Sequence, residues 1–327
     1  MKVRTFAGLA LLVAACGGAP GGALRERVTL PPGIVFAGVT DSLVAHGVVT
    51  HPTWFRVLAR LRGIDHHVQA GVYDLPRGRS AWTLLDRLSS GRIATNRLTV
   101  PEGLTMTEVA ALAAAELRIP VDSFLAAARD TSELRTLGLD GPTFEGYLLP
   151  ETYYVPVGST ARDLVRMMGR QFLAAWQPGW DQVLARRGMT RRQAVTLASI
   201  VEGEARKPEE RPIIAGVYTN RLLQGMALQA DPTVQYAIEL RRGKRKKRLF
   251  NKDYGFSSPY NTYLHLGLPP GPISSPGVQS LWAAVHPATV PYLYFVADST
   301  GGHQFSTTYA QHVRTIRRIR AVPAARR

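Results

Sequence analysis

Two glutamates at the end of an apolar helix, Glu202 and Glu204, are well placed in this sequence for acid–base chemistry. A capping-box spacing between Thr190 and Gln193 predicts that the helix begins there. Its buried face is predicted from apolar residues at helical spacing, namely Ala194, Leu197, Ala198 and Val201. Because helix positions two apart point in nearly opposite directions, at most one of the two carboxylates can face a given cleft.

A glutamate on the buried side of a helix is costly unless it has a partner. One interpretation is structural, with the carboxylate paired to Arg206, Lys207 or Arg211. The other is a general acid whose pKa is raised by burial, the kind of group that protonates the leaving oxygen of a glycosidic bond. The residues alone leave both interpretations open.

Longer motifs extend on both sides of this helix. A-S-I-V-E-x-E is followed by E-R-P, N-R-L and G-M-x-L-Q-x-D-P-T-V-x-Y. Further along come Y-N-T-Y-x-x-x-G-L-P-P-G-P-I, H-P-A-x-x-P-Y-L-Y-F-V-A-D and G-G-H-x-F. In their order and in their residues, these motifs resemble those of the bacterial endolytic murein transglycosylases of the MltG, or YceG-like, family. The resemblance covers roughly residues 97 to 315.

The resemblance implies an enzyme, a lyase that cleaves the β-1,4 bond between N-acetylmuramic acid and N-acetylglucosamine within peptidoglycan strands. In such lytic transglycosylases the muramoyl C6 hydroxyl attacks C1, giving a 1,6-anhydro end, so one glutamate can act as acid and then as base. The family motif places this role at Glu204, with Glu202 as the fallback. The resemblance also implies work on nascent strands, limiting their length, beside the peptidoglycan polymerases known as penicillin-binding proteins.

Basic neighbours of the predicted acid would lower its pKa and favour the wrong protonation state. We expect Arg206 and Arg211 to pair with Glu209 and Glu210 instead, and so to turn away from Glu204.

Polar residues of the matching motifs are predicted to contact the substrate: Glu151, Gln229, Asp231, Asn261 and Tyr263. Two of them have a structural alternative. Asp231 stands before a Pro-Thr pair and could form a turn or cap a helix. Tyr263 could line the groove or pack below it. Glu151 stands where the family more often has aspartate.

The N-terminus has the pattern of an export signal. Lys2 and Arg4 precede a short apolar run, residues 6–15, that ends in V-A-A-C at Cys16. This resembles a lipobox, which would lipidate Cys16; an ordinary signal peptide or a short uncleaved anchor is the alternative. We therefore expect a bacterial envelope protein, anchored to a membrane with its catalytic domain outside the cytoplasm. The net charge of +16 favours anionic lipid or acidic wall polymers as partners, rather than nucleic acid in an exported chain.

Alternating strand, turn and helix patterns predict an α+β protein with two domains. The expected divisions are a signal or anchor with its tether at 1–27, a small LysM-like α+β domain at 28–95, a larger mixed α+β catalytic domain at 96–315 and a basic tail at 316–327. The LysM-like assignment comes from the family resemblance. Trp54 and Trp82 are predicted to lie in the core of the small domain.

Two other classes of function were weighed. A metal-dependent wall hydrolase would need ligands such as His265, His286 or His303, but no H-E-x-x-H motif or ligand spacing occurs, and no metal or cofactor is predicted. A non-catalytic peptidoglycan-binding envelope lipoprotein is the alternative function. The basic run at 241–248 is interpreted as a solvated hairpin tip, or as a patch that touches acidic polymer or lipid.

Overall fold

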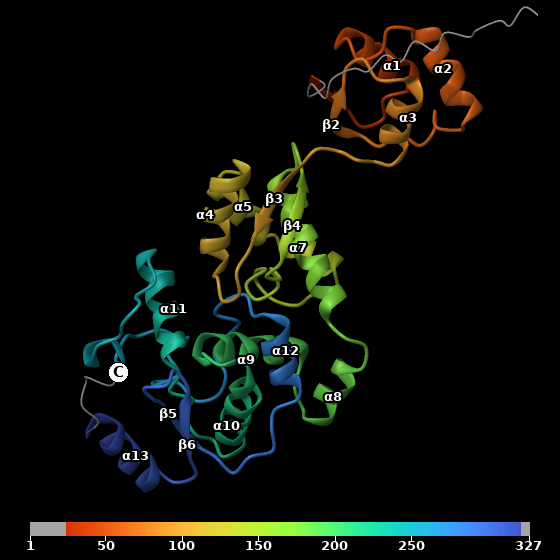
Figure 1. Ribbon diagram of the computed structural model, residues 1–327. Coiled ribbons are helices and arrows are strands. Elements are labelled where there is room, and N and C mark those ends of the chain that lie inside the picture. Colours follow the sequence, from red (N-terminus) through yellow and green to blue (C-terminus); the bar gives the residue numbers. More distant parts are fainter. Residues whose placement is uncertain (1–23, 322–327) are drawn as a thin grey trace, which may run out of the picture. The chain divides into compact units, whose positions relative to one another are not determined.

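The computed structural model describes residues 24–321, which divide into two compact units. One unit holds residues 24–94 with 156–158, and the other holds 95–155 with 159–321. The described residues form thirteen α-helices and three two-stranded sheets, which confirms the predicted mixed α+β class (Figure 1). Cys16 and the predicted export signal lie outside the described residues. Across residues 24–321, every helix is too short or too polar to cross a membrane.

The first unit is built on one antiparallel pair of strands. Its elements are β1 (Arg25–Leu30), α1 (Phe36–Ala45), α2 (Pro52–Leu61), β2 (Gly71–Pro76) and α3 (Ala81–Ser89). Val28 lies opposite Tyr73 in the β1–β2 register, and both side chains are fully buried. Leu43, Phe55 and Leu85, one from each helix, complete the same core. The likeness of this unit to a LysM module stays a prediction.

The two tryptophans of the first unit are not in its core. Trp54 is 58% exposed and Trp82 is 54% exposed, so the core prediction was wrong for both. On α2 the buried residue is the next one, Phe55, which points about 100° away from Trp54 around the helix. The ring of Trp82 instead carries the Arg62 guanidinium at 4.6 Å.

The second unit opens with a strand pair and four helices. These are β3 (Thr95–Thr99), α4 (Met106–Leu117), α5 (Val121–Ala128), α6 (Thr131–Thr136), β4 (Thr152–Pro156) and α7 (Ala161–Ala175). β3 pairs with β4, and α5 packs between α4 and α7. Apolar side chains from α5 and α7, including Phe124 and Phe172, are fully buried in the large core of this unit.

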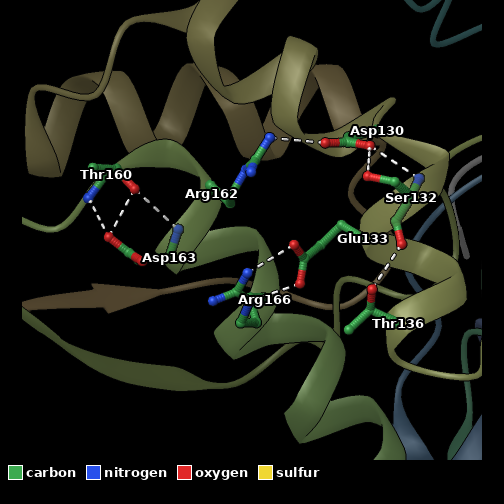
Figure 2. Close-up of polar contacts among 8 residues, drawn as sticks. All are labelled: Asp130, Ser132, Glu133, Thr136, Thr160, Arg162, Asp163 and Arg166. Atoms are coloured by element: carbon green, nitrogen blue, oxygen red, sulfur yellow. Dashed lines mark hydrogen bonds and ion pairs between the residues drawn. The ribbon is translucent and has the colours of Figure 1, made fainter.

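Polar contacts fix the way α6 meets α7 (Figure 2). α7 begins in a capping box, in which Thr160 and Asp163 each bind the other's backbone N–H. One turn further on, the Arg166 guanidinium donates two hydrogen bonds to the Glu133 carboxylate, at 2.6 and 2.8 Å. The Glu133 side chain is buried, and the hydrogen bonds from Arg166 lower its pKa below the ordinary value. The buried negative charge of Glu133 is therefore compensated by the positive charge of Arg166.

The rest of the second unit contains α9 (Arg191–Glu204), a helix with four other helices packed against it. The other elements of this part are α8 (Trp180–Arg186), α10 (Arg211–Leu223), α11 (Asp231–Arg242), α12 (Val278–Val285), β5 (Tyr294–Ala297), β6 (His303–Ser306) and α13 (Tyr309–Ala321), with short 3-10 turns at Pro208–Glu210 and Asn251–Asp253. α9 begins in the predicted capping box between Thr190 and Gln193, and every residue from Ala194 to Val201 is buried. It packs against α12, α10, α11 and α8, as the cluster in Figure 1 shows.

Candidate active site

Glu204 is the last residue of α9 and lines a cavity of about 470 Å³. α11 begins beside it because the preceding residue, Gly203, has no side chain. A Cβ on Gly203 would lie 2.7 Å from the Cβ of Pro232, too close for any other residue to fit without a shift. This close approach brings Asp231, the first residue of α11, to the same cavity.

The Glu204 carboxyl is partly buried and has two hydrogen-bond donors. The Tyr218 hydroxyl on α10 donates to Oε1 at 3.0 Å, and the backbone N–H of Asp231 also donates to the carboxyl. Burial raises the pKa of Glu204 to about 7, and the negative charge of Asp231 adds to the increase. The two donors and the Arg206 charge act in the opposite direction. A carboxyl with this raised pKa keeps a protonated population near neutral pH, which is the state a general acid needs.

Three predicted substrate residues lie on this cavity: Gln229, Asp231 and Tyr263. The Tyr263 hydroxyl donates to the Asp231 carboxylate at 2.6 Å, and burial raises the pKa of Tyr263 well above the ordinary tyrosine value. Gln229 has a φ of +51°, in the left-handed region that side chains other than glycine rarely adopt. Its backbone N–H donates to the carbonyl of Thr262 at 3.1 Å, which holds this strained residue at the rim.

Asn261 and Glu151 do not line the cavity. Asn261 is fully buried, and its amide donates to the carbonyls of Tyr254 and Phe256, both at 2.9 Å. Its carbonyl oxygen accepts from the backbone N–H of Tyr263, so Asn261 holds the loop that presents Tyr263. Glu151 is exposed just before β4, where its carboxylate accepts from the backbone N–H of Thr152 at 3.0 Å and its backbone carbonyl accepts from the N–H of Val100 at 2.9 Å.

Glu202, the fallback acid, lies on another face of α9. Its carboxylate accepts from Arg211 Nη2 at 3.1 Å and from the backbone N–H of Gly277 at 3.0 Å, and its side chain is 7% exposed. Glu202 is therefore held in an ion pair that supports the fold, whereas the surroundings of Glu204 suit a general acid. As the spacing predicts, the two carboxylates do not share a cleft.

The predicted pairing of the basic neighbours was wrong. Arg211 contacts Glu202 and, at 3.3 Å, Glu102, because the first turn of α10 faces the side of α9 that carries Glu202. Glu210 instead turns toward β6, where it accepts from Nδ1 of His303 at 2.6 Å and from its backbone N–H at 2.9 Å. Arg206 does lie at the cavity, and it makes no ion pair with any residue that the structure describes.

A model of the YceG-like family matches residues 28–318. The chain belongs to the YceG-like family. A relative from Bacillus subtilis, named endolytic murein transglycosylase, is 31% identical over 302 residues, covering 88% of this chain and 82% of the relative. A relative of the same name from Streptococcus pneumoniae is 29% identical over 308 residues, covering 84% of this chain but 54% of the relative. A crystal structure of a yceG-like protein from Listeria monocytogenes has a TM-score of 0.61 and 28% identity, covering 89% of this chain and 98% of that one.

Three residues on the cavity of this YceG-like protein were not predicted to belong to a glycan site: Tyr218, His303 and His312. Tyr218 lies in the motif stretch, but its contact with Glu204 depends on how α10 packs on α9, which no local pattern reveals. His303 was considered only as a metal ligand; in the structure its imidazole is held by Glu210. Within residues 24–321, no group of three or more His, Cys, Asp or Glu side chains is arranged to hold a metal ion.

Proposed function

We propose that this YceG-like protein is a peptidoglycan lytic transglycosylase in which Glu204 acts first as acid and then as base. The shared name of its relatives, endolytic murein transglycosylase, supports a lyase that acts on peptidoglycan strands. The single observation that carries the choice of acid is the partly buried carboxyl of Glu204, with a pKa of about 7, on a cavity of about 470 Å³.

In the first step the Glu204 carboxyl gives its proton to the glycosidic oxygen as the bond from that oxygen to the muramoyl C1 breaks. The N-acetylglucosamine side leaves with a free 4-hydroxyl. In the second step the muramoyl C6 hydroxyl bonds to C1 and its proton passes to the Glu204 carboxylate. The products are a 1,6-anhydromuramoyl end and a new N-acetylglucosamine end, no water is consumed, and the enzyme is restored.

The surroundings of Glu204 suit both steps. Burial and the Asp231 charge keep the carboxyl protonated for the first step, since both raise its pKa. Once the proton has left, the hydrogen bonds from Tyr218 and from the Asp231 backbone stabilise the carboxylate that serves as base. Gln229 and Tyr263 lie on the same cavity and are the proposed contacts to the sugar rings.

The proposal also covers the substrate strand, the partner and the membrane anchor. The substrate would be nascent glycan strands, shortened beside a peptidoglycan polymerase, with the protein held to a membrane through a lipidated Cys16 or an uncleaved N-terminal anchor. The first unit would act as a LysM-like module. The support for these points is the family resemblance and the N-terminal pattern, together with the exposed rings of Trp54 and Trp82 on that unit.

Mass spectrometry of glycan strands digested by the full chain tests the proposal. Strands ending in 1,6-anhydromuramic acid are the expected product. Reducing muramoyl ends would make the protein a hydrolase and require a second activated nucleophile. Binding to strands with no cleavage under any condition would favour the alternative, a wall-binding envelope lipoprotein.

A further inference from the structure

The basic run at 241–248 holds seven Lys and Arg residues, and the proposed reaction does not use it. It is not the tip of a hairpin, which corrects the expectation from sequence. Arg241 and Arg242 are the last residues of α11, Gly243 ends that helix with a left-handed φ of +70°, and the rest is a loop. The run therefore starts on the helix whose first residue is Asp231, at the cavity.

Specific contacts fix this loop. The Asp253 carboxylate accepts from Lys246 Nζ at 2.5 Å and from the backbone N–H of Phe250 at 2.7 Å. The Lys246 ammonium also lies 4.9 Å from the centre of the Phe250 ring. On the opposite side, Gln235 of α11 donates to the carbonyl of Lys247 at 3.2 Å. Gln235 and Lys247 both line the cavity, and this hydrogen bond ties the backbone of Lys247 to α11.

Three cations line the cavity, and two of them form no ion pair within residues 24–321. Arg221 is buried and its guanidinium donates to backbone carbonyls, including that of Leu293 at 2.7 Å. Arg206, just after α9, and Lys247 are exposed, and neither forms an ion pair within residues 24–321. The cavity therefore has two positive charges that no ion pair holds, on two segments far apart in sequence, in addition to the carboxyls of Glu204 and Asp231.

The chemistry of the strand indicates what these charges meet. In peptidoglycan the lactyl group of each muramic acid is joined to its peptide through an amide, so the glycan backbone carries no charge at such a residue. Away from its ends, the negative charges of such a strand are the carboxylates of its stem peptides. A cation at the rim can attract such a strand only through its peptides.

We propose that Arg206 and Lys247 bind carboxylates of the stem peptide attached at the cleavage site, and so select strands whose peptides carry free carboxylates. This inference rests on the proposed function, because it takes the cavity to be the glycan site. Exposed pairs of this kind are individually weak and are screened by salt. We therefore expect a preference of about three- to tenfold in kcat/KM, which shrinks as ionic strength rises.

The test compares two substrates: uncross-linked strands with free peptide carboxylates, and the same strands with those carboxyls converted to neutral methylamides. The full chain is expected to cleave the free-acid strands three- to tenfold better. In the double variant Arg206→Gln, Lys247→Gln the ratio is expected to fall to about one. Lys244→Gln is the matched control, since Lys244 is exposed in the same run but does not line the cavity, and this variant is expected to keep the ratio.

A wild-type ratio of one, or a double variant that keeps the wild-type ratio, would overturn the inference. A second readout separates this inference from the proposed function. Binding of both fluorescent strands is measured with Glu204→Gln, alone and combined with the double substitution. If no strand is cleaved, a preference for free-acid strands that disappears with Arg206 and Lys247 still supports the carboxylate site, and equal binding of both strands overturns it.

Discussion

The Tyr218 hydroxyl and the Glu204 carboxyl, 3.0 Å apart, join α10 to the end of α9 by one hydrogen bond. Tyr218 is fully buried and its own pKa is raised well above the ordinary value by burial and by Glu204, so it stays a donor throughout the working pH range. Because the bond favours ionised Glu204, it limits the increase in pKa that burial causes. In the proposed reaction, this balance suits a carboxyl that acts first as acid and then as base.

Replacing Tyr218 by Phe removes this donor and keeps the ring. The pKa of Glu204 should rise, so the basic limb of the pH profile, where the acid loses its proton, should move to higher pH. The base step should weaken at the same time, since the carboxylate loses a charge-assisted hydrogen bond, and we expect kcat to fall about tenfold or more. A pH series of kcat and kcat/KM measures both effects. A lower kcat with an unmoved basic limb would contradict the role given to Tyr218.

Replacing Asp231 by Asn should move the same limb in the opposite direction. The Asp231 charge raises the pKa of Glu204, so its loss should lower that pKa and leave less protonated acid at pH 7. The hydrogen bond from Tyr263 can still reach the side-chain oxygen. Glu209→Gln, at an exposed position away from the cavity, is the control for a general change in charge. The pH dependence of kcat/KM measures the position of the basic limb. A shift of that limb to higher pH would contradict the effect of Asp231 on the pKa of Glu204.

The raised pKa of Glu204 also predicts how stability depends on pH. A carboxyl that titrates near 7 in the folded protein and near 4.3 in the unfolded chain holds more protons when folded, so it lowers stability as pH rises through that window. Glu204→Gln should remove this penalty. We expect its stability relative to the wild type to increase by about 3 kcal/mol between pH 4 and pH 8. Denaturant unfolding of both proteins across this range measures the difference. A constant difference would mean that Glu204 titrates normally.

Glu202 and Glu204 should respond to mutation in opposite ways. Glu202→Ala leaves Arg211 and the Gly277 N–H without their buried partner, so we expect a loss of about 3–5 kcal/mol in the free energy of unfolding. Cleavage per folded molecule should stay within about threefold of the wild type, since Glu202 does not line the cavity. Urea unfolding measures the free energy of unfolding, and a glycan-cleavage assay at matched concentrations of folded protein measures the activity. A stable but inactive Glu202 variant would reverse the assignment of the two residues.

The sequence predicted those features of the site that depend on local pattern. The Thr190–Gln193 capping box and the apolar run fixed where α9 begins and which face it buries. The spacing of Glu202 and Glu204 required that they face different surroundings. Both follow from the geometry of a single helix and need no knowledge of its neighbours.

The features that were mistaken or missed depend on packing between segments distant in sequence. Arg211 contacts Glu202 and Glu102 instead of the adjacent acids, because the packing of α10 against α9 sets its direction. Asn261 matches a motif yet supports the loop from within, and no spacing distinguishes that position from one on the rim. The sequence also could not show that the basic run begins on the helix that carries Asp231 to the cavity.

The central claim is that a single carboxyl, Glu204, performs both proton transfers. Its most direct test is the rate at which 1,6-anhydromuramoyl ends form on uncross-linked strands, measured by mass spectrometry for the full chain and for Glu204→Gln at equal folded concentration. The account predicts that the variant, folded and still able to bind strands, forms these ends about 10²- to 10⁴-fold more slowly. A variant that forms them within about twofold of the wild-type rate would contradict it.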